Sequence, residues 1–213
     1  MNSTKKEISY TTTNSYSTLN KLSNRTKTIW FVCHGMGQLS ERFIEHFSIL
    51  DEVENYIIAP QAPSKYYHTQ EYKTVGASWL TKLNTKKDTE NVLRYFDSIF
   101  ENEHIPKDIS INFLGYSQGV SVVMRYIASR KIQFTQLILF AGGIPVELKP
   151  ENFTHLRMGF KVTYIYGDED TYLNNPRIAS EMKKLESLLP DAHKIARFSG
   201  NHTFNLEEAI KNI

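Results

Sequence analysis

Hydrophobic residues along this chain fall into two patterns, short unbroken apolar runs and longer segments with helical spacing. The short runs are rich in β-branched residues, which is typical of strands buried on both faces of a parallel sheet. They occupy residues 28–33, 56–59 and 137–141, and three more strands are predicted at 109–114, 161–166 and 193–198, where polar residues interrupt the run. Segments with helical spacing lie between or after them, at residues 40–50, 85–103, 120–130, 176–189 and 206–213. This alternation predicts right-handed βαβ units, and hence a mainly parallel sheet with helices on both faces.

Two segments lie outside the alternation. Residues 7–19 are rich in Thr, Ser and Tyr, so we expect a first edge strand or hairpin arm within residues 1–27, with a loose tail as the alternative. Residues 61–83 have no sustained period, which predicts a long loop with a short helical piece near Trp79. A loop of this length in a compact domain usually has a function.

Composition and charge narrow the class of protein. The 213 residues are 40% hydrophobic, which suits one domain over residues 1–213. With 25 basic and 23 acidic residues the net charge is +2, too weak a field to predict nucleic-acid binding. The single Cys33 excludes an intramolecular disulfide; we expect a buried structural thiol, and a nucleophilic cysteine is the alternative. Neither a signal peptide nor a membrane span is apparent, so we expect a cytoplasmic monomer or homodimer.

One motif carries the strongest chemical signal. Gly115-Tyr116-Ser117-Gln118-Gly119 lies between a predicted strand and a predicted helix. In that context G-x-S-x-G directs a serine hydroxyl outward from a sharp turn, where a base can deprotonate it. The two glycines are expected because a side chain at either position would collide where strand and helix pass closest. The sequence therefore predicts Ser117 as a nucleophile.

A serine nucleophile needs a general base and an acid that orients this base, and with this motif both follow the serine. His155, His193 and His202 are the histidines in that part of the chain. We predict His202 as the base, because it follows the last strand in a loop of small residues. The acid is expected just after the 161–166 strand, where Asp170 is predicted and Asp168 is the alternative.

The tetrahedral intermediate of such a reaction needs N–H donors aimed at its oxygen. One predicted donor is the backbone N–H of Gln118, directly after the nucleophile. The other is the N–H of Met36 in the glycine-rich loop after the first buried strand, where we expect His34 to be structural rather than catalytic. Trp79 and Ile144 are candidate substrate-binding residues, with a place in the core as the alternative for both.

Together these residues resemble the α/β-hydrolase fold, and within it the small carboxylesterases related to phospholipases and acyl-protein thioesterases. The similarity runs from about Trp30 to the C-terminus. The family's motifs appear as His34-Gly35-Met36-Gly37, Gly115-Tyr116-Ser117-Gln118-Gly119, Gly167-Asp168-Glu169-Asp170 and Gly200-Asn201-His202. The resemblance implies a single three-layer α/β/α domain with a mainly parallel sheet and minimal or no cap. It also implies that Ser117, Asp170 and His202 take the triad positions, with Met36 and Gln118 as oxyanion donors.

The expected function is that of a serine hydrolase that cleaves carboxylic esters through a Ser117 acyl-enzyme. Thioester or lysophospholipid hydrolysis by the same residues is the alternative, and a non-catalytic binding protein of this fold is a third. Residues 61–83 differ from the usual acyl-protein thioesterase sequence and are more similar to a bacterial branch of generic esterases. We expect a small-molecule ester as substrate, and neither a cofactor nor a metal.

Overall fold

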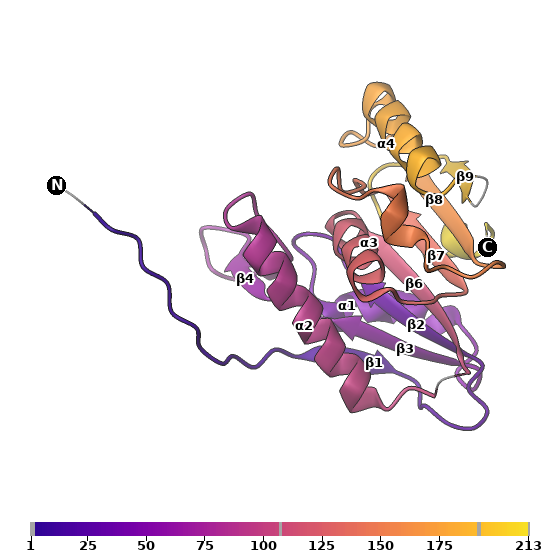
Figure 1. The fold of residues 1–213 in the computed structure, drawn as a ribbon, viewed down its shortest axis with the longest axis horizontal. Coiled ribbons are helices and arrows are strands. Elements are labelled where there is room, and N and C mark those ends of the chain that lie inside the picture. Colours follow the sequence, from indigo (N-terminus) through magenta and orange to yellow (C-terminus); the bar gives the residue numbers. More distant parts are fainter. Residues whose placement is uncertain (1–2, 107, 191–192, 213) are drawn as a thin grey trace.

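The computed structural model describes residues 3–106, 108–190 and 193–212. Its centre is a seven-stranded sheet with the order β1-β3-β2-β6-β7-β8-β9 (Figure 1). Only β1 is antiparallel to its neighbour among these described strands, so the prediction of a mainly parallel sheet is confirmed. The strands are β1 (Tyr16–Leu19), β2 (Thr28–Cys33), β3 (Asn55–Pro60), β6 (Ser110–Tyr116), β7 (Gln136–Phe140), β8 (Lys161–Gly167) and β9 (His193–Phe198).

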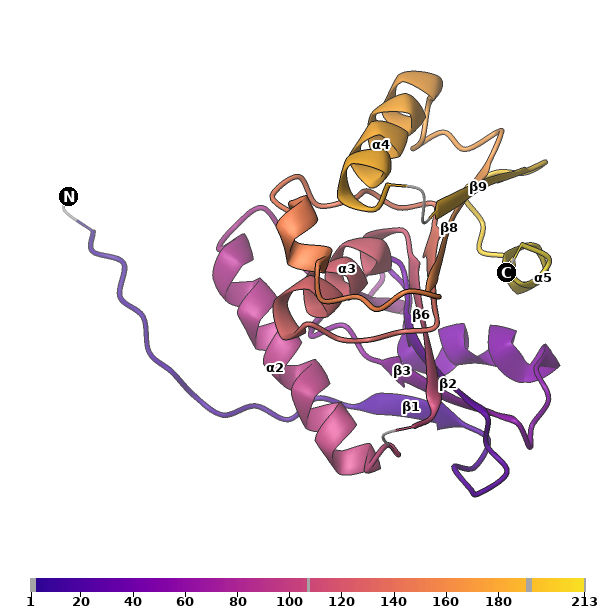
Figure 2. The ribbon, with the colours of Figure 1, turned by 45° about the vertical axis from the view of Figure 1, so that its right-hand side comes forward.

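Helices cover both faces of this sheet, as the alternation of elements predicts (Figure 2). One face carries α2 (Thr85–Glu103), α3 (Gln118–Arg130) and α4 (Asn175–Leu188), with the short 3₁₀ helix η2 (Pro150–Phe153). The other face carries α1 (Ser40–Phe43), the 3₁₀ helix η1 (Ile44–Ile49) and α5 (Leu206–Ile210). The result is a three-layer α/β/α architecture, as predicted.

The central strand β2 shows why the sheet is apolar on both sides. Its side chains alternate between the two layers, with Phe31 and Cys33 in the core under α2 and α3, and Trp30 and Val32 in the core under η1. All four are at most 3% exposed. Because side chains on both faces of this strand are buried in a core, no position faces solvent, and the sequence is a continuous apolar run.

Residues 61–83 differ from the prediction. They contain an antiparallel hairpin of β4 (Ser64–Tyr67) and β5 (Val75–Ser78), and the predicted helical piece near Trp79 is wrong. Every residue of β4 is exposed, so no face of that strand is selected to be apolar and the sequence shows no period of two. After β5, the backbone N–H of Trp79 donates to the Gln118 side chain instead of entering a helix.

The chain ends also refine the predictions. Only residues 16–19 of the predicted 7–19 segment form a strand, the antiparallel edge strand β1, while residues 3–15 have no regular structure. In Figure 1 this segment extends away from the body of the protein. The predicted helix at 206–213 is shorter and ends at Ile210, and Ile213 lies outside the described residues. Within the described ranges, no helix combines the length and apolar character needed to cross a bilayer.

Candidate active site

Ser117 lies on a sharp turn between β6 and α3. Its φ of 52° and ψ of −115° place it in a region that residues with a side chain rarely adopt. A Cβ atom on Gly115 would lie 2.5 Å from the backbone nitrogen of Val120, and one on Gly119 would lie 2.1 Å from the carbonyl oxygen of Cys33. Both distances are far below van der Waals contact, so the predicted steric need for these glycines is confirmed.

Loops after two other strands bring a histidine and an aspartate to this turn. Nε2 of His202, which follows β9, lies 2.9 Å from Oγ of Ser117. Nδ1 of the same ring lies 2.6 Å from Oδ2 of Asp170, which follows β8. The three side chains therefore form one continuous hydrogen-bonded chain at the carboxyl end of the sheet, where parallel α/β sheets collect their functional residues.

The two candidate acids have different surroundings. Asp170 is 5% exposed, and its second oxygen, Oδ1, accepts the backbone N–H groups of Tyr172 at 2.8 Å and Leu173 at 3.0 Å. Asp168 is exposed, and its pKa lies below the usual value because it accepts the N–H of Gly200 and pairs with Arg197 at 3.1 Å. Asp170 is thus the carboxylate that meets His202, while Asp168 ties its own loop to the end of β9.

Two tyrosines hold the His202 loop, and sequence analysis identified neither. The hydroxyl of Tyr116 donates to the carbonyl of His202. Burial, reinforced by the charge of Asp170, raises the pKa of Tyr116 to about 12, so this hydroxyl remains a donor at neutral pH. The ring of Tyr172 packs 4.8 Å from the imidazole, centre to centre. Tyr116 occupies the x position of G-x-S-x-G, where a large residue was the only available signal.

The loop that contains Met36 is held in place from outside. The N–H of Gly37 donates to the carbonyl of Ala77 in β5 at 2.7 Å, and Nε2 of His68 donates to the carbonyl of Gly37 at 2.6 Å. Met36 and Gln118 both line the pocket at Ser117. Within the described part of the chain, neither backbone N–H donates to a protein acceptor, so both are available to an oxygen in the pocket.

His34 has the structural role that sequence analysis favoured. It is fully buried, its Nδ1 donates to the carbonyl of Gly35 at 2.8 Å, and its Nε2 accepts the N–H of Ala62 at 3.1 Å. Burial lowers the pKa of His34 to about 4, and the bond to Gly35 offsets this only in part. The neutral imidazole therefore joins two loop segments and does not face Ser117.

The Gln118 side chain has a structural role that the sequence did not indicate. Its Oε1 accepts the N–H of Trp79 at 2.7 Å, and its Nε2 donates to the carbonyl of Leu80 at 2.7 Å. The residue directly after Ser117 thus fixes the segment that leaves β5. The polar fourth position of Gly-Tyr-Ser-Gln-Gly was the signal, but its partner lies 39 residues away.

A cavity of about 490 Å³ opens at Ser117. Its walls include Met36, Gln118, Tyr172, Arg177 and His202. The candidate substrate residues Trp79 and Ile144 are not among its lining residues; they are 1% and 3% exposed and belong to the core.

Cys33 is also fully buried, and burial raises the pKa of its thiol. His155 and His193 bond to the carbonyls of Ile132 and Leu189 and do not line this cavity.

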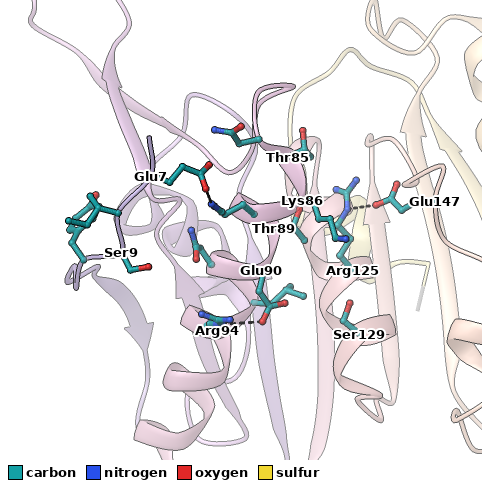
Figure 3. A pocket seen from close by; sticks show the side chains of 16 residues that line it. Glu7, Ser9, Thr85, Lys86, Thr89, Glu90, Arg94, Arg125, Ser129 and Glu147 are labelled. Atoms are coloured by element: carbon teal, nitrogen blue, oxygen red, sulfur yellow. Dashed lines mark hydrogen bonds and ion pairs between the residues drawn. The ribbon is translucent and has the colours of Figure 1, made fainter. Parts of the chain in front are cut away.

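A larger hollow of about 1510 Å³ lies between the N-terminal segment and helices α2 and α3 (Figure 3). Its polar side chains form ion pairs with one another, including Glu7 with Lys87 and Arg125 with Glu147. No histidine or cysteine is among the described residues that line it. Because one wall is the exposed extended segment around Glu7, this hollow is a gap beside the body of the protein.

Solved structures support the same fold. Zea mays acyl-protein thioesterase 2 is 14% identical, with a TM-score of 0.70 over 93% of this chain and 96% of that one. A phospholipase/carboxylesterase from Dyadobacter fermentans is 22% identical, with a TM-score of 0.66 over 93% and 94%. A carboxylesterase from Mesorhizobium loti is 13% identical, with a TM-score of 0.66 over 87% of each chain. At these identities the likeness shows the α/β-hydrolase fold alone. No curated protein sequence matches the chain significantly.

The family comparison covers nearly the whole chain and all the loops described above. The model of the phospholipase/carboxylesterase family matches residues 14–208, from just before β1 into α5. This range includes the turn at Ser117, the glycine-rich loop at Met36 and the loops that carry Asp170 and His202. The chain belongs to the phospholipase/carboxylesterase family of α/β hydrolases.

Proposed function

We propose that this protein hydrolyses carboxylic esters through an acyl-enzyme on Ser117. The observation that carries the proposal is the unbroken chain from Asp170 through His202 to Ser117, with contacts of 2.6 Å and 2.9 Å. A serine hydroxyl is a weak nucleophile at neutral pH, and this arrangement supplies the base and the group that orients it. Membership of a hydrolase family and the available N–H groups of Met36 and Gln118 support the same chemistry.

In the first half of the reaction, Oγ of Ser117 attacks the ester carbonyl while Nε2 of His202 takes its proton. Asp170 accepts the Nδ1 proton of His202, which selects the tautomer with a free Nε2 and stabilises the imidazolium that forms. The carbonyl oxygen becomes an anion, and the N–H groups of Met36 and Gln118 donate to it. The C–O bond then breaks, and His202 returns its proton to the leaving alcohol.

In the second half, water attacks the acyl group on Ser117. His202 takes one proton of that water, the hydroxyl group joins the acyl carbon, and the proton returns to Oγ of Ser117 as the carboxylic acid leaves. The two half-reactions use the same groups in the same positions, so no second base is required. Removal of either oxyanion donor in such a site typically costs about 10²–10³ in rate.

The shape of the cavity supports small substrates. Its lining residues include none from β4 or β5, so the hairpin does not form a cap over Ser117, and its volume is about 490 Å³. We expect short or medium acyl groups to be preferred. Thioesters or lysophospholipids are the alternative substrates of the same residues.

Labelling with a fluorophosphonate probe, followed by mapping of the adduct by mass spectrometry, tests the mechanism. We expect one adduct on Ser117, no adduct in Ser117→Ala, and a strongly reduced labelling rate in His202→Ala. His155→Ala is the matched control, because that histidine bonds to the carbonyl of Ile132 outside the cavity. An unlabelled Ser117, as in a non-catalytic binding protein, or equal labelling of the two histidine variants, would refute the proposal.

A substrate panel separates the two reaction classes. Matched oxygen esters and thioesters with acetyl, butyryl, octanoyl and lauroyl groups are compared by kcat/KM. A higher value for acetyl or butyryl oxygen esters is expected. A strong preference for lauroyl thioesters would instead assign the protein to the thioesterases that share these residues.

A further inference from the structure

The cavity at Ser117 contains one permanent charge. Among the described residues that line it, Arg177 is the single lysine, arginine, aspartate or glutamate. It is exposed and lies in the first turn of α4, where its own backbone N–H donates to the side chain of Asn174.

The guanidinium of Arg177 has a defined position. Nη1 donates to the carbonyl of Tyr172 at 3.0 Å. Nη2 lies 3.4 Å from the point that a Cβ atom on Gly143 would occupy. The group therefore lies between the loop that carries Asp170 and the segment that follows β7, and the lack of a side chain at Gly143 leaves space beside it. The remaining N–H groups of the guanidinium are left for other acceptors.

Within the described residues, no carboxylate oxygen lies within 4.0 Å of this arginine, in contrast to Arg125, Arg130 and Arg197. Glu181 lies one helical turn further along α4 and is 4% exposed, and its Oε1 lies 3.8 Å from the same Cβ point on Gly143. Glu181 instead accepts the N–H of Ile144 at 2.8 Å and pairs with Lys184 at 3.0 Å.

We propose that Arg177 is a specificity residue that makes this cavity a site for esters bearing an anionic oxygen group, a carboxylate or a phosphate, beside the scissile bond. Guanidinium groups bind such anions through paired N–H donors in charge-assisted hydrogen bonds. Arg177 takes no part in bond making or breaking. The inference rests on the proposed hydrolysis at Ser117 and names the substrate class of that site.

The test compares matched neutral and anionic esters. On the acyl side, 4-nitrophenyl butyrate is compared with the half-ester 4-nitrophenyl succinate; on the alcohol side, ethyl butyrate is compared with the butyryl ester of glycolate. For Arg177→Gln we expect kcat/KM to fall about 10- to 100-fold, mainly through KM, on the anionic ester of either the acyl-side pair or the alcohol-side pair. The loss on the anionic ester should exceed any loss on its neutral partner by about this factor, and Arg177→Lys should recover part of it. The pair that responds shows on which side of the scissile bond the anion lies.

Arg94→Gln is the matched control. It removes the same charge from an exposed side chain on α2 that pairs with Glu90 and lies outside this cavity. It should change no ratio of anionic to neutral rates. A binding measurement gives an independent readout: succinate or inorganic phosphate should raise the Tm of the unchanged protein but not that of Arg177→Gln. The anion that does so identifies the group that is recognised.

The outcomes separate this inference from the proposed function. If the neutral esters are hydrolysed and Arg177→Gln lowers neutral and anionic rates equally, or lowers neither, the anion site is refuted while the serine mechanism stands. If no ester of either pair is hydrolysed and the fluorophosphonate leaves Ser117 unlabelled, the proposed function itself is refuted.

Discussion

Replacement of Asp170 by Asn is the sharpest perturbation of the proposed mechanism, because it changes one atom and leaves the shape of the side chain intact. In the unchanged protein, Oδ2 of Asp170 accepts the Nδ1 proton of His202, and Oδ1 accepts two backbone N–H groups. In Asp170→Asn, the amide oxygen must stay on the two N–H groups, so the NH₂ group faces His202. The imidazole then accepts on Nδ1 and carries its proton on Nε2, toward Ser117.

That tautomer cannot take the proton of Ser117. A reversed histidine tautomer of this kind costs about 10⁴ in kcat in a well-studied serine protease, equivalent to about 5.5 kcal/mol of transition-state stabilisation. Stability should change far less, because both backbone N–H groups keep their acceptor and the variant no longer buries a carboxylate charge. We expect less than about 2 kcal/mol of lost unfolding free energy, which is less than about 8 °C in Tm for a chain of this size.

The assay is hydrolysis of 4-nitrophenyl butyrate, with urea unfolding of the same samples. Asp168→Asn is the matched control, because Asp168 is exposed and contacts Arg197 and Gly200 instead of His202. We expect that control to retain activity within about threefold. If Asp170→Asn kept more than about a tenth of the activity, or if Asp168→Asn showed the large loss, the assignment of the acid would be wrong.

Three further predictions concern the surroundings of the site. Folded His34 stays neutral down to a pKa of about 4, whereas the unfolded chain takes up this proton near pH 6.5. The contribution of His34 to the free energy of unfolding should therefore fall by about 3 kcal/mol from pH 7 to pH 4. Urea unfolding measures the fall, and an NMR titration of His34 near pH 6.5 would contradict it. Gly142→Ala should destabilise the protein by at least about 1–3 kcal/mol and abolish esterase activity, since its Cβ would lie 2.2 Å from the carbonyl oxygen of Ser117. Gly143→Ala, whose Cβ meets nothing closer than 3.4 Å, should keep its Tm and its rate on 4-nitrophenyl butyrate, and equal loss in both variants would refute the steric argument. Deletion of residues 1–12 should change Tm by less than about 4 °C, because the contacts of the described residues 3–12, such as the Glu7 ion pair, are exposed. Deletion through β1 should lower Tm much further, and the same small shift in both would contradict the role of that strand.

The sequence predicted those strands whose side chains are buried in the hydrophobic cores on both faces of the sheet. Residues 28–33 were predicted as a strand and form β2, because every one of their side chains but the first is buried on one face or the other. The turn at Ser117 was predictable for a related reason: Gly115 and Gly119 are required by backbone contacts within the same strand–turn–helix unit. Local sequence contains all the information that such units need.

The structural elements that the sequence did not predict depend on contacts between distant segments, or lie in segments too short to define a period. Residues 40–50 were expected as one helix, but the structure has four α-helical residues followed by a 3₁₀ helix. Over so short a length, apolar residues at positions 43, 44 and 47 are compatible with the period of an α-helix and with that of a 3₁₀ helix. β4 is exposed throughout, so its formation depends on pairing with β5 and not on burial. The placement of Tyr172 and Arg177 in the cavity depends on how two loops and a helix meet, which no local pattern encodes.

The side chain of Gln118 has a consequence for how the protein opens. It joins the turn at Ser117 to Trp79 and Leu80, and through them to the hairpin that holds the carbonyl and N–H of Gly37. Three segments that are distant in the sequence thus share one cooperative unit, in which the hairpin cannot detach without exposing the turn at Ser117. In native-state hydrogen exchange, the amides of Gly37 and Trp79 should therefore exchange with the same opening free energy. Under the proposed mechanism, the loop that contains Met36 stays formed for as long as the turn at Ser117 does, so partly opened molecules would be inactive instead of less selective.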